Sequence, residues 1–378
     1  MPKSWLHKIL RDEAASGIVL LLAGSAGLIL ANTPLADFYH AFWRVEFLGI
    51  HYAGWINDAL IPVFYLVVGL EIKREMGSHG SLSDWRRASL PIIAALGGMV
   101  APAIVYFICV AGHPEFYRGW AVPAATDIAF AVGIMALLAK RLPPSLRVFM
   151  LTLAIVDDLG SILIIGLFYA GQLDALYVGN ALAIVGAMWG LRRLKIDRAW
   201  PYLLLSVPLW YCVHHSGIHA TIAGVILAFA LPRASGKKVL SALHAWVAFA
   251  ILPVFAFANA GVTLKGMTIE SLDHPVFWGI VLGMFLGKQI GIFSAIAVAV
   301  KSGISRLPPH AGWAQVYGMS ILGGVGFTMA LFIGSLSFQD GALIDRTRLA
   351  IMTGSFLAAV MGYMVLFLTS KRSSRHGA

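Results

Sequence analysis

The sequence contains few charged residues for its length. Aspartate, glutamate, lysine and arginine make up 12% of its 378 residues, whereas 59% of the residues are hydrophobic. Soluble domains have about 25% charged and about 45–50% apolar residues, so a water-soluble fold is not expected. Apolar runs of roughly 20 residues, enough for a helix to cross a hydrocarbon core of about 30 Å, recur along the chain. The composition predicts an all-α membrane protein with a single transmembrane domain over residues 1–378.

Cysteine and acidic residues are scarce as well. The two cysteines, Cys109 and Cys212, lie in apolar runs, so no disulfide framework is expected. The net charge of +10 comes from 28 Lys and Arg against 18 Asp and Glu. These basic residues occur in short clusters and form no continuous basic face, so nucleic acid is not expected as a partner. Neither a Ser/His/Asp nucleophile set nor a complete metal-ligand set emerges, so we expect a transporter without a cofactor and not an enzyme.

Twelve apolar ranges are predicted to be transmembrane helices: 14–31, 55–72, 88–111, 119–139, 146–169, 175–191, 200–213, 219–231, 243–260, 276–300, 313–336 and 348–368. If the N-terminus is cytoplasmic, 22 of the 28 Lys and Arg fall in cytoplasmic segments and five in outer segments. The remaining one, Lys288, lies within a span. Cytoplasmic loops of membrane proteins are enriched in Lys and Arg, so both termini are expected in the cytoplasm.

Two triplets of these spans have opposite predicted orientation. The spans within 88–169 begin inside, whereas those within 276–368 begin outside. The middle span of each triplet contains residues that weaken a helix, Pro123 in one and the glycine-rich segment Gly323–Gly326 in the other. Unwound backbone at membrane depth survives only against protein or a water-filled cavity. We therefore expect inverted-topology repeats with two broken helices and a site at the repeat interface, an organisation suited to alternating access.

Asp157 and Asp158 stand near the middle of the fifth predicted span. An ionised carboxylate at that depth costs on the order of 2.5–3.5 kcal/mol, and repulsion between neighbours favours protonation of one of them. A carboxylate binds either a proton or a hard cation such as sodium, so a site that must lose one to hold the other couples their movements. The alternative is a buried pair neutralised by a partner helix. Consecutive helical residues point about 100° apart, so one is expected to face a cavity and the other a separate partner.

Lys288 lies too deep in the tenth span to reach the membrane surface, and it is the natural partner of Asp157. From the sequence it is equally a structural neutraliser or a proton carrier. Asp127, beside Thr126, directly follows the Pro123 break. It is expected to neutralise the positive N-termini of broken helices, with direct cation ligation by both residues as the alternative.

Other polar residues lie near the ends of predicted spans. Glu71 and Glu75 are four residues apart on one helix face, where they could collect cations at a funnel or simply form a solvated helix end. Asp58 lies near the outer mouth, where a helix-capping role is expected. His219 could titrate near neutral pH, whereas a zinc site with His214 and His215 is disfavoured by the intervening Gly217.

Seven motifs resemble those of the NhaA-type sodium/proton antiporters, in the same order and over nearly the whole chain. They are WINDAL (Trp55–Leu60), VGLEIKRE (Val68–Glu75), PAATDIAF (Pro123–Phe130), AIVDDLG (Ala154–Gly160), GIHAT (Gly217–Thr221), FAFANAG (Phe255–Gly261) and GVGFTM (Gly324–Met329). The resemblance implies about 12 transmembrane helices whose two broken helices cross. It also implies exchange of sodium or lithium for more than one proton, which is electrogenic, rises at alkaline pH and serves sodium extrusion and pH homeostasis.

The resemblance also assigns roles to individual residues. Asp158 matches the principal carboxylate for cation and proton, and Asp157 beside it matches the partner of the lysine found here at Lys288. Thr126 and Asp127 match residues at the crossing of the broken helices. The candidate sodium ligands are therefore Asp158, Asp157, Thr126 and Asp127.

The family's pH response has been placed at positions that match Glu71, Glu75 and His219. The implied location is the bacterial cytoplasmic (inner) membrane, in contact with lipid. Two departures from the family pattern stand out. Leu240-Ser241 replaces an acidic residue followed by histidine, so the pH threshold is expected to differ. The outer loop from Asn32 to Gly54 is shorter than in members where it forms a dimerising β-hairpin, although Phe42–Phe47 is expected to form a strand and a homodimer remains a hypothesis.

A sodium-coupled symporter of a small solute is the main alternative function, because it could use the same broken helices and carboxylates. A requirement for a co-substrate would distinguish the two. A cation channel is a further alternative, and turnover too fast for alternating access would support it.

Overall fold

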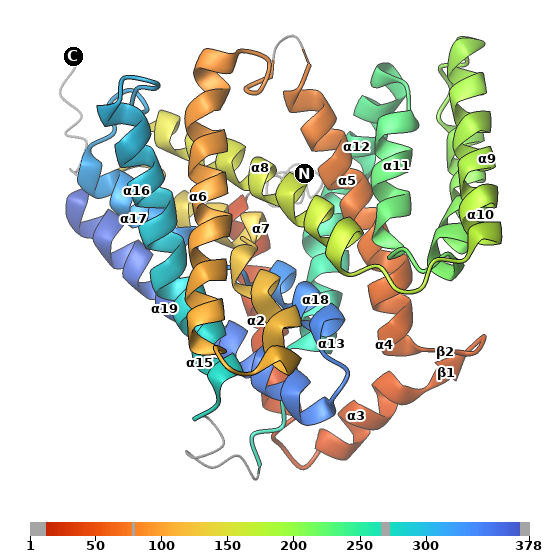
Figure 1. Cartoon of the computed structure of the whole chain (residues 1–378), viewed down its shortest axis with the longest axis horizontal. Helices are drawn as coiled ribbons and strands as arrows, with labels where there is room; N and C mark the ends of the chain where they lie inside the picture. Colours follow the sequence, from red (N-terminus) through yellow and green to blue (C-terminus); the bar gives the residue numbers. More distant parts are fainter. Residues whose placement is uncertain (1–12, 78–79, 266–272, 371–378) are drawn as a thin grey trace, which may run out of the picture.

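The structure is a computed structural model that describes residues 13–77, 80–265 and 273–370. Residues 1–12 and 371–378 lie outside this part, so the predicted cytoplasmic location of both termini is not examined by the structure. The described residues form helices joined by short loops and a two-stranded hairpin (Figure 1). The α-helices are α2 (Glu13–Leu30), α3 (Ala36–Arg44), α4 (Tyr52–Trp55), α5 (Ile61–Glu75), α6 (Trp85–Cys109), α7 (Ile128–Leu137), α8 (Pro144–Phe168), α9 (Ala175–Arg193), α10 (Trp200–His215), α11 (Thr221–Ala230), α12 (Arg233–Trp246), α13 (Leu252–Asn259), α15 (Pro275–Leu282), α16 (Lys288–Lys301), α17 (Trp313–Leu322), α18 (Phe327–Ser337) and α19 (Gly341–Thr369).

Three of the long helices contain one wider π turn each. These turns are η1 (Ile56–Leu60), η3 (Val247–Ile251) and η4 (Gly283–Gly287), and they join α4 to α5, α12 to α13 and α15 to α16. A π turn adds a residue to the helical repeat and is frequent at functional sites. Here η1 contains Asp58 and η4 ends immediately before Lys288. Asp58 therefore lies inside the continuous helix Tyr52–Glu75, and the helix-cap role predicted for it is wrong.

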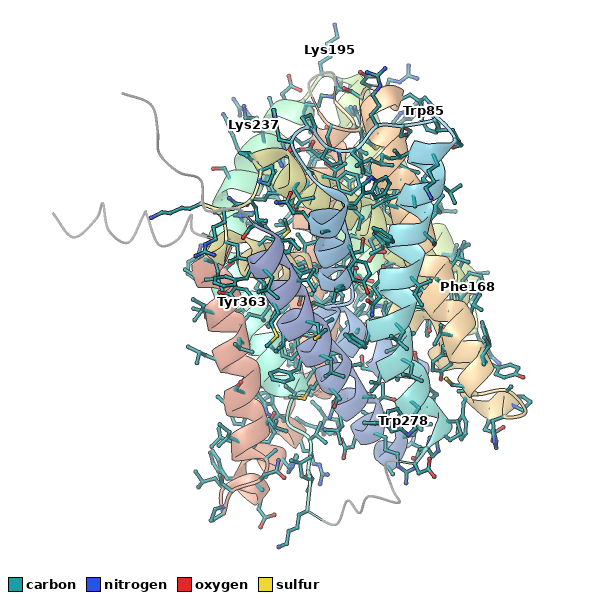
Figure 2. All side chains as sticks on the ribbon, turned by 90° about the vertical axis from the view of Figure 1, so that its left-hand side faces the viewer. Trp85, Phe168, Lys195, Lys237, Trp278 and Tyr363 are labelled. Carbon is teal, nitrogen blue, oxygen red and sulfur yellow. The ribbon has the colours of Figure 1, made fainter. Side chains whose placement is uncertain are left out.

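The surface of the helical bundle is apolar, as expected of a protein that lipid surrounds. Large hydrophobic side chains with more than half of their area exposed occur on many helices, for example Leu22, Ile108, Leu167 and Leu368. Figure 2 shows Lys195 and Lys237 near one end of the molecule and Trp278 toward the opposite end. The two segments that contain these lysines were predicted to lie on the same side of the membrane, and the structure places both lysines near one end.

Each of the twelve predicted spans overlaps a helix of the structure. Among the described residues, seven helices are long and apolar enough to cross a membrane, and nine if each of two bent pairs is counted as one span. The three remaining predicted spans correspond to α2, α10 and α11. Two helices begin much earlier than the apolar runs suggested: one begins at Arg233, where the run began at 243, and the other at Gly341, where the run began at 348. A window chosen for hydrophobicity misses such polar helix ends. The beginning of the helix at Gly341 is stabilised by an ion pair between Asp345 and Arg348, one turn apart.

Both broken spans are present. The first consists of the 3-10 helix η2 (Pro114–Ala124) and α7, which meet at 40°, and the second consists of α17 and α18, which meet at 42°. In each predicted triplet the bent pair lies between two long helices, α6 and α8 in one, the α15–α16 run and α19 in the other. The triplets pack together along α6 and α16. Gly97 and Gly291 permit this contact, because a Cβ atom on either would lie within 2.5 Å of the other's carbonyl oxygen.

Helix α8 occupies the centre of the molecule and contacts α5, α6 and α7 (Figure 1). This position brings the middle of α8 against both broken spans and α5. At the lower right of Figure 1, β1 (Glu46–Phe47) and β2 (Ile50–His51) pair antiparallel beside α4. The prediction of a strand over Phe42–Phe47 is wrong for its first three residues, which belong to α3. Tyr39 and Trp43 of α3 pack their rings against Phe257, and this contact favours the helix.

Candidate functional site

The two broken spans meet at their breaks. The backbone N–H of Asp127 donates to the carbonyl oxygen of Val325 at 2.7 Å, and the Thr126 hydroxyl donates to the Gly323 carbonyl at 2.8 Å. Backbone groups freed by a break must find partners inside a membrane protein, and each break here supplies partners for the other. The crossing that the resemblance implied is therefore present, and it fixes Thr126 and Asp127 at its centre.

The carboxylate of Asp127 joins the N-termini of the half-helices α7 and α18. Its Oδ1 accepts from the backbone N–H of Phe130 in α7, and its Oδ2 accepts from the N–H and hydroxyl of Thr328 in α18, at 3.0, 3.0 and 2.5 Å. Helix N-termini carry partial positive charge and unpaired N–H donors. Asp127 is thus placed as the expected neutraliser, and both of its oxygens are already engaged.

Asp157 on α8 forms a buried ion pair with Lys288. The Nζ atom of Lys288 lies 3.0 Å from each carboxylate oxygen and 2.8 Å from the Thr126 hydroxyl, to which it also donates. Both charged side chains are completely inaccessible to solvent. The sequence-based expectation that Lys288 pairs with Asp157 agrees with this geometry. The pair ties α8 and α16 to the crossing through three hydrogen bonds.

Asp158 has a different environment. Its side chain is 1% exposed, and neither carboxylate oxygen has a hydrogen-bond partner among the described residues. It faces a cavity of about 120 Å³, here called the site cavity, whose lining includes Val68, Glu71, Asp127, His244 and Thr328. An unpaired carboxylate at membrane depth is costly, so it is expected to bind a proton or a cation. The cavity has room for either species to reach it.

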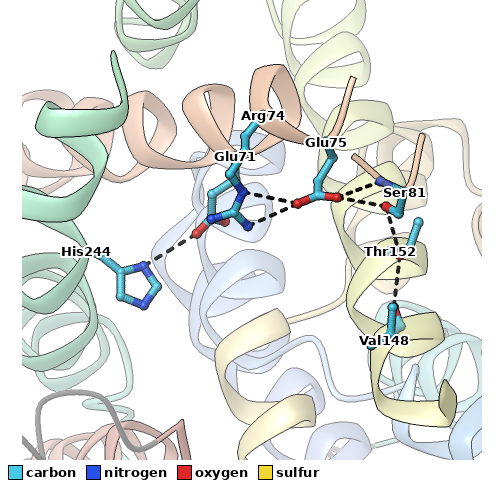
Figure 3. Close-up of polar contacts among 7 residues, drawn as sticks. All are labelled: Glu71, Arg74, Glu75, Ser81, Val148, Thr152 and His244. Atoms are coloured by element: carbon cyan, nitrogen blue, oxygen red, sulfur yellow. Dashed lines mark hydrogen bonds and ion pairs between the residues drawn. The ribbon is translucent and has the colours of Figure 1, made fainter. Parts of the chain in front are cut away.

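The two glutamates of α5 have separate surroundings (Figure 3). Glu71 lines the site cavity and lies 3.5 Å from Nδ1 of His244 on α12. Glu75 instead pairs with Arg74 at 3.1 Å and accepts from the N–H and hydroxyl of Ser81 at 2.9 and 3.0 Å. The structure therefore brings Glu71, but not Glu75, to the cavity that Asp158 faces. Glu75 instead holds Ser81 close to the end of α5.

Asp58 and His219 lie together at the other end of α5. The Nε2 atom of His219 is 3.8 Å from Asp58 Oδ1, its Nδ1 is 3.0 Å from the Thr221 hydroxyl, and its ring packs on Phe332. Within the described part of the chain, no group of three or more His, Cys, Asp or Glu side chains is arranged to hold a metal ion. His219 therefore lies apart from the site cavity, between α10 and α11.

Comparison with known proteins decides the family. The model of a family described as Na+/H+ antiporter 1 matches residues 7–366. The Na(+)/H(+) antiporter NhaA of Caulobacter vibrioides is 46% identical over 380 residues, which cover 98% of this chain and 92% of the relative. The NhaA of Bordetella parapertussis is 48% identical, with 96% of each chain covered. The NhaA 1 of Pseudomonas putida is 46% identical, with 98% of each covered.

The chain belongs to the Na+/H+ antiporter 1 family. The resemblance inferred from the seven sequence motifs is thereby confirmed.

Two side chains of the candidate site were not singled out from the sequence. Thr328 provides two of the three donors to Asp127, and His244 faces Glu71 across the site cavity. Thr328 could have been found from its position two residues after the glycine-rich break, where a half-helix N-terminus was already expected. No local signal marks His244, because its apposition to Glu71 depends on how α12 packs beside α5.

Proposed function

We propose that this chain is a secondary active antiporter that exchanges sodium or lithium for protons across the bacterial cytoplasmic membrane. The observation that carries the proposal is the buried, unpartnered carboxylate of Asp158 at the site cavity. Such a carboxylate is stable when it holds a proton or a hard cation, and it cannot hold both. A proton must therefore leave when sodium binds, and sodium must leave when a proton returns.

The neighbouring groups give the exchange its setting. Asp127 has both oxygens occupied by helix N-termini, and Asp157 is held by Lys288. In this state Asp158 is the candidate ligand whose oxygens have no protein partner. Thr126, Asp127 and Asp157 shape the crossing around it. Transfer of a second proton, for which Lys288 is the candidate carrier, would make the exchange electrogenic.

Alternating access follows from the architecture we propose: twelve spans, both termini cytoplasmic, and two triplets of inverted topology. Because the broken spans depend on each other for hydrogen bonds at the crossing, movement of one triplet moves the other. The site is then exposed to one side of the membrane at a time. The short hairpin β1–β2, with Leu48 exposed at its tip, is the candidate contact of a homodimer.

Activation at alkaline pH forms part of the proposal. Glu71 and His244 lie 3.5 Å apart at the site cavity, Glu75 connects the end of α5 to Ser81, and His219 lies beside Asp58. The charge of these groups sets the electrostatic potential that a cation meets on its way to Asp158. Exchange at high pH would serve sodium extrusion and pH homeostasis.

The test is proton movement in inside-out vesicles with an acidic lumen, from cells that lack their own sodium/proton exchange. Sodium and lithium, but not potassium, are expected to release lumenal protons between about pH 7 and 8.5. Asp158→Asn should abolish this release, because the neutral amide binds neither a proton nor a cation tightly.

Asp174→Asn is the matched control, because it also neutralises a carboxylate but at an exposed helix cap of α9. It is expected to exchange ions normally. Normal exchange by Asp158→Asn, present in the membrane at wild-type level, would refute the proposal. Cation-dependent proton movement that required an added solute would instead identify a symporter.

A further inference from the structure

A second cavity, here called the basic cavity, lies between the end of α5 and the first turns of α12, at the end of the molecule where Lys237 is found (Figure 2). Its volume is about 500 Å³. The charged side chains that line it are four basic ones and one acidic one: Lys73, Arg74, Arg233, Lys237 and Glu75. It shares no lining residue with the site cavity, so it is separate from the place where Asp158 is exposed.

The positive charge of the basic cavity is not balanced by the protein. The one acidic residue in its lining, Glu75, already binds Arg74 at 3.1 Å and the backbone N–H of Ser81 at 2.9 Å (Figure 3). Arg233 and Lys237 form no hydrogen bond and no ion pair with any residue that the structure describes. Their charged groups are therefore available to a ligand.

Helix packing holds these basic groups together. Arg233 and Lys237 are four residues apart and lie on one face of α12. Lys73 fixes the end of α5 near the start of α12, because its Nζ atom donates to three carbonyl groups at the end of α11. Gly236 lies against α5, since a Cβ atom on it would be 3.0 Å from the side chain of Leu70. The cavity is thus formed by two packed helices.

Basic residues at this end of the protein also serve membrane orientation. Any basic residue on the cytoplasmic side fulfils that role, as do the exposed Lys238 and Lys301, which do not line the basic cavity. Orientation does not require four basic side chains from two helices around one cavity, where like charges repel. A bound anion offsets this repulsion.

A phosphate group suits the donors that the basic cavity offers. Arginine binds phosphate oxygens through two N–H groups at once, and lysine adds a point charge with rotatable donors. Arg233 has all of its N–H groups free, and Arg74 binds Glu75 through only some of its five. The first turn of α12 contains no acidic side chain and has no side-chain cap, so it adds partial positive charge. Cavities of about 300–1,000 Å³ accept small molecules, so there is room for a phosphate with an attached organic group.

We propose that the basic cavity binds an anion that carries a phosphate group, held by Arg233 and Lys237 of α12 and by Arg74 of α5. Lys73 adds charge while its N–H groups bind backbone carbonyls. The phosphate belongs either to a soluble phosphate ester or to a lipid headgroup, because both are recognised by the same contacts. The bound anion joins α5 to α12 and stabilises the folded protein.

The test is thermal unfolding of the purified full-length protein in a neutral detergent at pH 7.5, followed by tryptophan fluorescence in the absence of sodium. One probe is phosphate as its choline salt, compared with choline chloride at equal ionic strength. The other is dioctanoyl phosphatidylglycerol, compared with dioctanoylglycerol, which has the same chains and no phosphate. At least one of the two probes should raise the melting temperature, because a ligand of the folded state stabilises it.

Arg233→Gln/Lys237→Gln should need at least about tenfold more of that probe for half of the maximal rise, because two contacts to a charged group are lost. Both side chains are exposed, so the variant should fold and melt near wild type without a probe. Arg233→Lys keeps the charge but not the paired N–H groups, and its requirement should lie between those of wild type and the double variant.

Lys238→Gln/Lys301→Gln is the matched control. It removes the same two charges from exposed positions in segments predicted to be cytoplasmic, outside the basic cavity, and it should respond like wild type. A response to phosphate identifies a soluble phosphate ester as sufficient, and a response to phosphatidylglycerol alone identifies a lipid headgroup.

The inference is overturned if wild type responds to neither probe, or if Arg233→Gln/Lys237→Gln responds like wild type. Equal weakening in the control variant would also overturn it, since this indicates general attraction between opposite charges. Asp158→Asn should respond to the probes like wild type, so this result is independent of whether the proposed antiport holds.

Discussion

The buried pair Asp157–Lys288 allows a quantitative prediction about stability. Lys288→Met removes the ammonium and leaves the Asp157 carboxylate in a site with no access to solvent. Removal of one partner from a buried ion pair costs about 3–5 kcal/mol. Unfolding entropy is about 2.1 cal/mol/K per residue, or about 0.8 kcal/mol/K for 378 residues. The melting temperature should therefore fall by about 4–6 °C at pH 8.

Asp157→Leu removes the other partner and leaves the Lys288 ammonium unpaired in the same inaccessible site. Its melting temperature should therefore fall by a similar amount at pH 8, because either single variant leaves one buried charge without its partner.

The double variant Asp157→Leu/Lys288→Met decides between this explanation and simple loss of packing. Replacement of a whole buried pair by apolar side chains is often neutral or stabilising, so the double variant should melt near wild type. The assay is tryptophan fluorescence of the purified protein during heating in detergent, with choline in place of sodium to exclude stabilisation by bound cation. A double variant as unstable as the sum of the two single variants would refute the reasoning.

Two further predictions concern the packing of α5 and α11. Gly224→Ala should lower the melting temperature sharply or prevent accumulation in the membrane, because its Cβ would lie 2.0 Å from the Pro62 carbonyl oxygen, whereas Gly186→Ala, with open space around it, should behave like wild type. Lys73→Met should cost about 1–3 kcal/mol in thermal unfolding, since Nζ donates to three carbonyl groups at the end of α11. Lys73→Arg should retain most of this stability; equal loss in both would show that the carbonyl contacts do not matter.

The breaks in the two spans could be predicted because their causes are local. Proline and clustered glycine weaken a helix wherever they occur, and the cost of free backbone groups in a membrane implies that such segments lie against protein. Asp157, Asp158 and Lys288 were expected far from the ends of apolar runs, and the structure buries all three inside the bundle. Local composition and spacing were sufficient to predict the breaks and the interior position of these charges.

The partners of individual polar groups could not be predicted in the same way. Glu71 and Glu75 are spaced to lie on one face of α5, yet one lines the site cavity and the other binds Ser81. That difference comes from Ser81 and Leu82, whose backbone N–H groups donate to the carboxylate and to the carbonyl oxygen of Glu75. Similarly, the contact of Glu71 with His244 depends on how α12 packs beside α5, which no local pattern in the sequence specifies.

The adjacent carboxylates of α8 illustrate why an antiport site needs both kinds of information. About 100° of helical rotation separates Asp157 from Asp158, so the two cannot share one partner. One is directed at Lys288 and the Thr126 hydroxyl, and it gives the crossing a fixed, neutral ion pair. The other is left with its lone pairs free at a cavity. In the proposed antiport, the pairing of Asp157 with Lys288 leaves Asp158 as the carboxylate that takes a proton or sodium, because two unpaired carboxylates side by side would disfavour ionisation of both.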